Sequence, residues 1–334
     1  MALRVDDKWA YNGLPIVRIE NAAFTMDIAP TLGAKVLHLI DKAADRDVLY
    51  HSPRVLPHQA PLGANVDDHY TGGWDDVFPT GTPSVNAHAD ELPYLGEVWT
   101  LALDHTILES GPERVVVRFE GDTPITPAHW TRTVTIEGDA PVITLDTRIE
   151  NTGFRGFDYI WGSHPGLAIR EGFRIDTPAG GKGEVTIGGR GVLGATGETY
   201  DYPVLRAGEE GEMDVSLIPG SETTDYALHA ISGLPDEAWV AVTDPETQRG
   251  FGIAFDARVN RSLWLWMAYG EPRGWYFLAP EPWISPQPGL KEAVEAGTAA
   301  HLEAGEAMEA RMTAVLYSGV SRVSRIAPDG TVSG

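Results

Sequence analysis

The sequence predicts an all-β protein, a large antiparallel β-sandwich with long loops and at most short helices. Two observations support this class. Short apolar or alternating runs recur at intervals of about a dozen residues, and turn-forming residues separate them. One segment alone, residues 289–300, keeps helical spacing, and it is short.

The expected strands form three groups along the chain. They are residues 15–19, 24–28 and 35–40, then 99–107, 114–120, 130–136 and 142–149, and finally 239–243, 250–255, 262–267, 275–279 and 307–317. Residues 51–97 are irregular, and their four aromatic side chains favour an ordered, functional segment. Residues 171–221 are rich in glycine and are expected to decorate the sandwich.

The length of 334 residues allows two average domains, but large β-sandwiches exceed 200 residues as single units. We therefore expect one domain over residues 1–334, with a core at about 14–318. The tail, 327–334, is expected to be frayed.

The composition excludes several classes of partner. A formal net charge of −23 argues against nucleic acid and against anionic membrane surfaces, which both recruit basic patches. The absence of cysteine excludes disulfides and thiolate chemistry. Neither a secretory signal nor a run of 18 apolar residues is visible, so we expect a cytoplasmic protein without a membrane span.

A histidine stands between small residues and a proline at mid-chain, in Trp161-Gly162-Ser163-His164-Pro165-Gly166. It follows residues 142–151, which alternate like a strand. The two glycines leave space beside the imidazole, and Pro165 restricts the backbone of His164. These residues are typical of an approachable acid or base held at fixed geometry, although a structural histidine in a turn fits them as well.

Two glycines precede an indole and two carboxylates in Gly72-Gly73-Trp74-Asp75-Asp76. An indole can stack on the C–H groups of a sugar while carboxylates accept its hydroxyl hydrogen bonds. The alternative is a tight turn with Trp74 in the core. The neighbouring Asp67-Asp68-His69 lacks a characteristic metal-ligand spacing, so no metal site is expected there.

A further carboxylate, Glu281, ends an apolar run and is flanked by prolines in Pro280-Glu281-Pro282-Trp283. Burial beside aromatic residues would disfavour its ionised form, which suits a general base working near neutral pH. A purely structural glutamate is the alternative. Two weaker candidates are the turn Leu95-Gly96-Glu97-Val98-Trp99 and Asp225, which opens an alternating run and can equally be a capped or solvated aspartate.

Together these residues resemble the aldose 1-epimerases, or galactose mutarotase-like proteins, whose fold is a β-supersandwich. The resemblance covers about residues 14–318 and is most specific over 159–317. Ser163-His164-Pro165 is similar to the family's mid-chain histidine turn, and Pro280-Glu281-Pro282-Trp283 is similar to the surroundings of its catalytic glutamate. Asp225, in Thr224-Asp225-Tyr226-Ala227-Leu228, is a weaker candidate for the family's hydroxyl-binding aspartate.

The sequence departs from the family at two places. Leu95-Gly96 stands where members commonly carry a second histidine in a His-Gly turn. The family's Asn-Arg pair for the sugar is absent, and Arg132 or His129 is the available substitute. The Gly-Gly-Trp-Asp-Asp segment therefore indicates a divergent branch.

The resemblance implies an isomerase that interconverts the anomers of an aldose or a sugar derivative. Glu281 would be the base for the anomeric hydroxyl and His164 the acid for the ring oxygen, without a metal or an organic cofactor. The expected substrate-binding residues are Trp74, Asp75, Asp76, Glu97, Trp99, Arg132, Asp225 and Trp283.

The expected partner is a small-molecule sugar, and a homodimer is compatible with the sequence. Two alternatives stay open at this point. One is a non-catalytic carbohydrate sensor on the same scaffold. The other is a related acid/base isomerase that acts on a phosphorylated, sulfonated or oxidised sugar.

Overall fold

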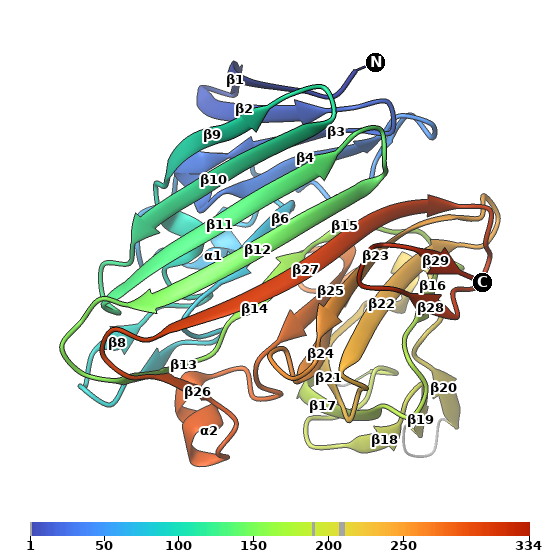
Figure 1. The fold of residues 1–334 in the computed structure, drawn as a ribbon. Helices are drawn as coiled ribbons and strands as arrows, with labels where there is room; N and C mark the ends of the chain where they lie inside the picture. Colours follow the sequence, from blue (N-terminus) through green and yellow to red (C-terminus); the bar gives the residue numbers. More distant parts are fainter. Residues whose placement is uncertain (1, 189–190, 207–210) are drawn as a thin grey trace. The chain divides into compact units, whose positions relative to one another are not determined.

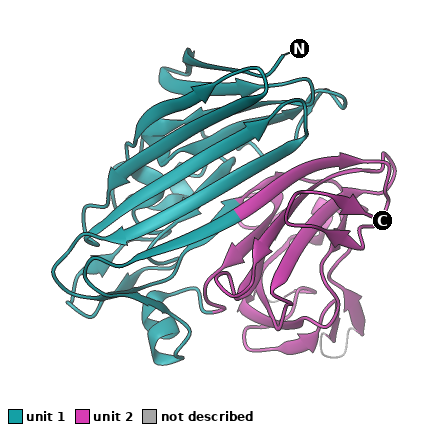
Figure 2. Cartoon of the chain, in the orientation of Figure 1, with its two compact units in different colours: residues 1–164, 287–311 teal, residues 165–286, 312–334 magenta. Residues whose placement is uncertain are grey.

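The structure is a computed structural model that describes residues 2–188, 191–206 and 211–334 (Figure 1). The chain divides into two compact units (Figure 2). Unit 1 comprises residues 1–164 and 287–311, and unit 2 comprises residues 165–286 and 312–334. Both units consist mainly of antiparallel strands, so the predicted all-β sandwich class is confirmed. The assignment of the chain to one domain stays a prediction.

Unit 1 contains two groups of strands that form separate layers (Figure 1). The first group has the order β1 (Arg4–Tyr11), β2 (Leu14–Glu20), β3 (Phe24–Ala29), β4 (Lys35–Asp41), β6 (Trp74–Val77) and β14 (Gly162–Pro165), with β5 (Arg46–Asp47) beside β4. The second has the order β12 (Val142–Asn151), β11 (Ala128–Glu137), β10 (Arg114–Asp122) and β9 (Asp104–Ser110). Shorter elements are η1 (Pro30–Leu32), α1 (Val66–His69), β7 (Ser84–Val85), β8 (Glu91–Leu92), η2 (Val98–Thr100), β13 (Phe157–Tyr159), α2 (Leu290–Glu295) and β26 (Ala300–Leu302).

Alternating side chains explain why the second layer packs on one face only. Along β12, Ile143, Leu145, Thr147 and Ile149 are buried, whereas the residues that alternate with them are half-exposed. This pattern places every second side chain in the core, as expected for a strand with one solvated face. The alternation predicted for residues 142–151 is confirmed.

Unit 2 also contains two groups of strands. The first has the order β25 (Tyr276–Trp283), β24 (Ser262–Tyr269), β21 (Asp225–Ser232), β17 (Lys182–Gly188), β18 (Thr199–Asp201), β19 (Val204–Arg206) and β20 (Glu212–Asp214), with β15 (Leu167–Ala168) beside β25. The second has the order β16 (Arg174–Asp176), β22 (Glu237–Asp244), β23 (Arg249–Asp256) and β27 (Ala307–Ser318). Nearly all residues of β24 and β25 are buried, so these strands are covered on both faces. The unit also contains η4 (Ser221–Thr223), β28 (Arg325–Ile326) and β29 (Val332–Ser333).

The structure corrects three local expectations. The helix expected over 289–300 ends at Glu295, two residues before Gly297, whose φ is 69°. The strand expected from Trp99 begins only at Asp104, because residues 98–100 form the 3-10 helix η2. The segment around His164, expected to be a turn, is the strand β14.

The tail expected to be frayed from Ala327 onward is instead part of a hairpin. Strands β28 and β29 pair with each other, and the Asp329 side chain accepts a hydrogen bond from the Thr331 amide in the turn between them. Ile326 is buried, and the Thr313 hydroxyl donates to the Pro328 carbonyl at 2.8 Å. The tail is therefore ordered by its own turn and by contacts with the rest of unit 2.

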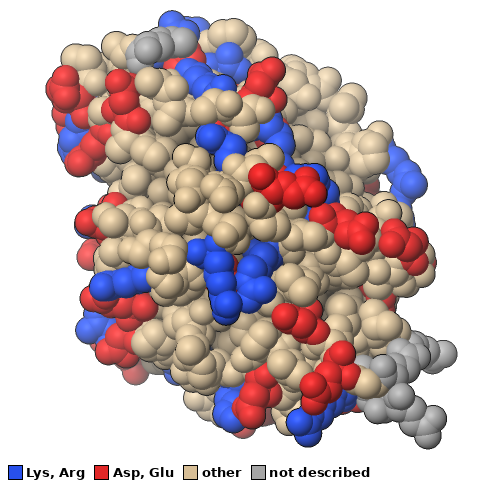
Figure 3. Space-filling view, turned by 90° about the vertical axis from the view of Figure 1, so that its right-hand side faces the viewer, with Lys and Arg blue, Asp and Glu red and all other residues tan. Residues whose placement is uncertain are grey.

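One face of the molecule carries charged side chains of both signs (Figure 3). On the face in Figure 3, acidic and basic side chains are interspersed with uncharged ones. None of the helices in the described residues is long and apolar enough to cross a membrane.

Candidate functional site

In unit 1, the glycine-tryptophan segment and the histidine segment meet through their side chains. Trp74 Nε1 donates a hydrogen bond of 2.6 Å to Ser163 Oγ, and both residues are buried. The glycines before Trp74 are required by close packing of the backbone. A Cβ on Gly72 would lie 2.0 Å from the Tyr50 carbonyl oxygen, and one on Gly73 would lie 2.7 Å from the Val36 carbonyl oxygen.

The first carboxylate after Trp74 is held by a buried lysine. Lys35 Nζ lies 3.0 Å from Asp75 Oδ2, and both side chains are more than nine-tenths buried. Burial raises the pKa of Asp75, and the charge of Lys35 counteracts it. Asp75 Oδ1 is buried and has no hydrogen-bond partner among the described residues, so it can accept a hydrogen bond from a ligand or a water.

The second carboxylate belongs to a buried network. Asp76 forms an ion pair with Arg132 of β11 and accepts a hydrogen bond of 3.1 Å from Trp161 Nε1. Arg132 also donates to the Thr147 hydroxyl at 3.3 Å. Burial raises the pKa of Asp76, and Arg132 and Trp161 counteract it. Arg132 Nε is also buried and has no hydrogen-bond partner among the described residues.

His164 itself is 7% exposed and lies beside aromatic and charged groups of the same unit. The Tyr70 ring meets its imidazole edge-on, with ring centroids 5.9 Å apart, and Lys35 Nζ lies 5.7 Å from the Tyr70 ring centroid. Burial, and then the positive charge of Lys35, lower the pKa of His164 to about 4. The imidazole is therefore neutral at neutral pH and can accept a proton.

Glu281 lies in unit 2, in β25, with aromatic neighbours. It is 2% exposed, and its register partner on β24 is Trp264. Trp283 Nε1 donates a hydrogen bond of 2.8 Å to Glu281 Oε2, and the Trp264 and Trp283 rings stack with centroids 3.8 Å apart. Burial raises the pKa of Glu281 well above its usual value, and the Trp283 hydrogen bond offsets only part of this. The carboxyl is thus driven toward its protonated form.

Three other predicted residues make structural contacts within their own units. Glu97 is fully buried and accepts hydrogen bonds from the backbone amides of residues 125 and 126, at 2.6 and 3.0 Å. Trp99 Nε1 donates to the Tyr94 carbonyl at 3.3 Å. Asp225 accepts a hydrogen bond of 2.9 Å from the Leu193 amide and one of 2.9 Å from the Tyr226 amide. Each of these contacts fixes a loop.

The predicted residues therefore fall into distinct clusters. Unit 1 brings together Trp74, Asp75, Asp76, Arg132 and His164, and unit 2 brings together Glu281 and Trp283. Trp74 is 1% exposed, Trp99 8% and Trp283 0%, so protein covers most of each indole. A role for these rings in sugar stacking remains a prediction.

Lys35 and Tyr70 were not among the predicted site residues, although both adjoin His164. The sequence offers one signal for Lys35, since a lysine begins an otherwise apolar run. A buried histidine in unit 2, His229, was also missed. Its Nδ1 lies 2.7 Å from the Tyr200 hydroxyl, and burial lowers its pKa to about 4.

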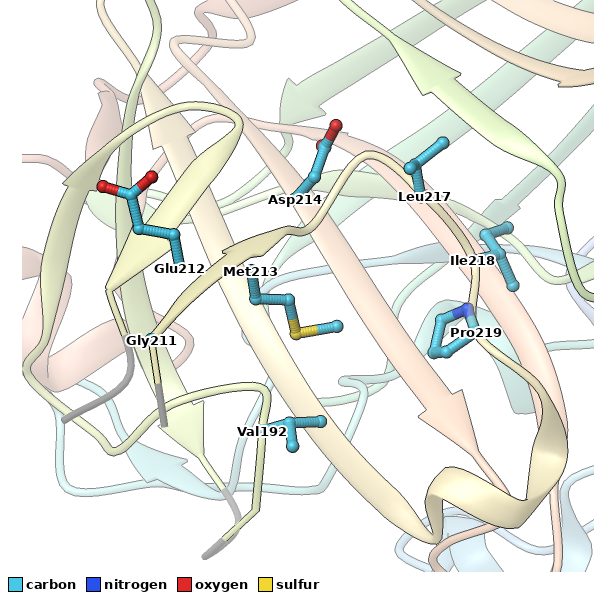
Figure 4. A pocket seen from close by; sticks show the side chains of 8 residues that line it. All are labelled: Val192, Gly211, Glu212, Met213, Asp214, Leu217, Ile218 and Pro219. Atoms are coloured by element: carbon cyan, nitrogen blue, oxygen red, sulfur yellow. The ribbon is translucent and has the colours of Figure 1, made fainter. Parts of the chain in front are cut away.

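Two cavities in the described parts of the chain lie away from these clusters. One in unit 1, of about 750 Å³, is lined by residues that include His88, Asp90 and Arg155. One in unit 2, of about 470 Å³, is lined by Val192, Gly211, Glu212, Met213, Asp214, Leu217, Ile218 and Pro219 (Figure 4). Neither cavity is lined by a predicted site residue.

Comparison with known proteins identifies the fold. No protein-family profile matches the chain, and no curated protein matches it either. Solved structures of other proteins do match the chain. A candidate aldose 1-epimerase from Klebsiella pneumoniae superposes with a TM-score of 0.71 and 16% identity, over 94% of this chain and 83% of that one.

Two galactose mutarotase-like proteins also match. The protein from Lactobacillus casei has a TM-score of 0.62 and 15% identity, over 90% of this chain and 100% of its own. The protein from Clostridium acetobutylicum has a TM-score of 0.65 and 11% identity, over 95% of this chain and 99% of its own. At these identities the likeness shows a shared galactose mutarotase-like fold.

Proposed function

We propose that the protein is an acid/base isomerase that interconverts the α and β anomers of an aldose or a sugar derivative. The observation that best supports this proposal is the state of His164 and Glu281. Each is buried within its unit, and burial shifts each pKa toward the neutral form of the side chain. Strongly shifted pKa values of this kind are concentrated at functional sites. The mutarotase-like fold is compatible with the same reaction.

The proposed reaction opens and recloses the sugar ring. A base removes the proton of the anomeric hydroxyl while an acid protonates the ring oxygen, and the bond between the anomeric carbon and the ring oxygen breaks. Rotation about the adjacent C–C bond then presents the other face of the carbonyl. Reclosure returns both protons, so the protein ends as it began. Each of the two groups would contribute roughly 10²–10⁴-fold.

The proton distribution in the free protein bears on the two roles. Glu281 as base and His164 as acid require a carboxylate and an imidazolium. Burial instead favours a carboxylic acid and a neutral imidazole. Both states carry one proton on the pair, so the free protein holds the required number. We propose that this proton is on Glu281 when the reaction starts. During ring opening Glu281 would then protonate the ring oxygen, and His164 would accept the proton of the anomeric hydroxyl.

Two buried atoms of unit 1 that lack a hydrogen-bond partner among the described residues would orient the sugar. Asp75 Oδ1 can accept a bond from a hydroxyl hydrogen, and Arg132 Nε can donate one to a hydroxyl oxygen. The ion pairs with Lys35 and Asp76 hold both side chains in place. We propose these two atoms, rather than Glu97 or Asp225, as sugar contacts, because the latter carboxylates already bind backbone amides.

Exchange NMR tests the proposed activity. The rate of α/β interconversion is measured over a panel of aldoses, uronic acids and sugar phosphates, for wild type and for Glu281→Gln, His164→Gln and the double variant. His229→Gln is the matched control, because it also removes a buried histidine. We expect acceleration for at least one sugar, a large loss in each single variant and none in the control.

The double variant tests whether the two groups serve one reaction. Groups that act together are non-additive, so the double variant should be about as slow as the slower single variant. Losses that multiply would show that the two residues act independently and would remove the paired mechanism.

A non-catalytic carbohydrate sensor is the second candidate. One observation favours it, namely Leu95-Gly96 at the place where the resembling family carries its second histidine. Titration calorimetry with the same sugar panel separates the two candidates. A sensor would bind a sugar without accelerating exchange, and Glu281→Gln would alter its affinity only modestly.

A further inference from the structure

Three side chains of unit 1 that play no part in the proposed reaction converge on one point. His38 lies on β4, Asp47 on β5, and His51 on the segment that bridges to Gly72. Their ligand atoms all lie within 4.8 Å of one another. Both imidazoles contact the same carboxylate oxygen, Asp47 Oδ2, through His38 Nδ1 at 2.7 Å and His51 Nε2 at 2.8 Å.

The carboxylate is oriented by the backbone. Asp47 Oδ1 accepts hydrogen bonds from the amides of Leu39 and Leu49, at 3.1 and 3.0 Å, which leaves Oδ2 to the two histidines. Outer hydrogen bonds of this kind orient the ligands in metal sites.

The site is open on one side. The side chains of His38 and Asp47 are 19% and 20% exposed, and that of His51 is 37% exposed. The two imidazole rings lie 4.6 Å apart and are tilted by 34°. Solvent can therefore reach the point between the three ligand atoms and complete the coordination of an ion.

We propose that His38, Asp47 and His51 form a binding site for a divalent transition-metal ion of the zinc type. Two imidazole nitrogens and one carboxylate oxygen form a ligand set that favours such ions over Mg²⁺ or Ca²⁺. Three protein ligands leave at least one coordination position for water. The inference is independent of the proposed sugar chemistry, which needs no metal.

Binding requires a small local rearrangement. The present N···O separations are hydrogen-bond distances, whereas ligand atoms around a tetrahedral zinc ion lie about 3.3 Å apart. Each histidine nitrogen must therefore move about 0.5 Å farther from Asp47 Oδ2, and each histidine must carry its proton on the other ring nitrogen. The partly exposed His51 can supply that movement.

The position of the site suggests what the ion would do. His51 pairs with Gly72, and the Gly73 amide donates to the Tyr50 carbonyl at 2.9 Å. An ion at His51 would therefore tie β4 and β5 to the segment that leads into Trp74. Its role would be to hold this segment in place.

Calorimetric titration with ZnCl₂, after chelator treatment and dialysis, tests the site in the full-length protein. The variants are His51→Ala and Asp47→Asn, and His129→Ala is the matched control. His129 is suitable because its Nδ1 also lies 2.7 Å from a carboxylate oxygen, that of Asp122. Among the described residues, however, His129 does not belong to a group of three potential metal ligands. Substituting Co²⁺ adds a visible absorption spectrum that reports nitrogen and oxygen ligands.

We expect wild type and the control to bind one Zn²⁺ per chain, and we expect each variant to lose at least 100-fold in affinity. Circular dichroism verifies that the variants are folded. If Asp47→Asn does not fold, the more exposed His51→Ala decides the question alone. Failure of wild type to bind one equivalent saturably, or unchanged affinity in His51→Ala, would overturn the proposal. Neither readout involves a sugar, so failure of the isomerase proposal would leave this result unaffected.

Discussion

The surroundings of His164 and of Glu281 differ in chemistry, but both favour the neutral form of the side chain. In unit 1, His164 adjoins the ring of Tyr70 and the charge of Lys35, near two buried ion pairs. In unit 2, Glu281 adjoins stacked indoles, one of which donates to its carboxyl. Burial lowers the pKa of the histidine and raises that of the glutamate. A polar and an aromatic environment can thus both hold an ionisable side chain neutral.

Replacing Glu281 with glutamine should have the largest effect. The amide oxygen still accepts the Trp283 hydrogen bond, but the side chain can no longer transfer a proton. We expect anomer exchange to slow by about 10²–10⁴-fold, with the free energy of unfolding near that of wild type at pH 7. Exchange NMR and urea unfolding measure the two quantities. Exchange within threefold of the wild-type rate would remove Glu281 from the mechanism.

Substitution of Arg132 removes one of the two buried ion pairs of unit 1. Arg132→Met leaves the buried Asp76 carboxylate without its counter-ion, which should lower the free energy of unfolding by about 3–5 kcal/mol. Urea denaturation measures this. Arg114→Met is the control, since its ion pairs are exposed and should contribute less than about 1 kcal/mol. Equal losses in the two variants would contradict the burial argument.

The pH dependence of stability sharpens the comparison. The pKa of His164 is about 4 in the folded protein and near 6.5 when unfolded, so the unfolded chain binds more protons between these values. Stability is therefore lost as pH falls from 6.5 to 4, by up to about 3 kcal/mol for this residue. His164→Gln should remove that part of the slope, and His129→Gln should not. An unchanged slope in His164→Gln would show that the imidazole is not held neutral.

Glu281 should contribute in the opposite direction. Its pKa is raised in the folded protein, so its contribution to stability is full below pH 4.5 and is lost as pH rises through the folded-state pKa. The exchange rate should fall over the same alkaline range, because Glu281 then loses the proton with which the proposed reaction starts. On the acid side the rate should fall near pH 4, as His164 becomes protonated.

Trp283→Phe should have the smallest effect. It removes the hydrogen bond to Glu281 Oε2 but leaves a ring that can stack on Trp264. We expect a loss of about 1–2 kcal/mol in the free energy of unfolding. Because that hydrogen bond lowers the pKa of Glu281, the alkaline limb of the rate profile should move to higher pH. A shift to lower pH would contradict the assignment of that limb to Glu281.

The sequence predicted those features that depend on local pattern. The alternation of residues 142–151 predicts burial directly, because successive side chains of a strand lie on opposite faces of the sheet. The hairpin of the tail was missed because its strands contain two residues each, too few to show a period. The sequence around His164 predicts a turn, because glycine and proline are typical of turns, whereas the chain forms a strand there.

The contacts of the candidate site depend on residues far apart in the chain. Trp74 bonds Ser163, 89 residues away, and the Asp225 side chain binds an amide 32 residues away. Lys35 looked like one charged residue at the start of an apolar strand, and only the fold brings it to Asp75. Residue types could therefore suggest candidates, but their partners followed only from the structure.

The most direct test of the proposed function is exchange NMR of α and β anomer signals over the sugar panel at neutral pH. We predict that catalytic amounts of the protein accelerate exchange of at least one sugar and that Glu281→Gln slows this exchange by about 10²–10⁴-fold. Absence of acceleration for every sugar, from protein shown to be folded by circular dichroism, would contradict it.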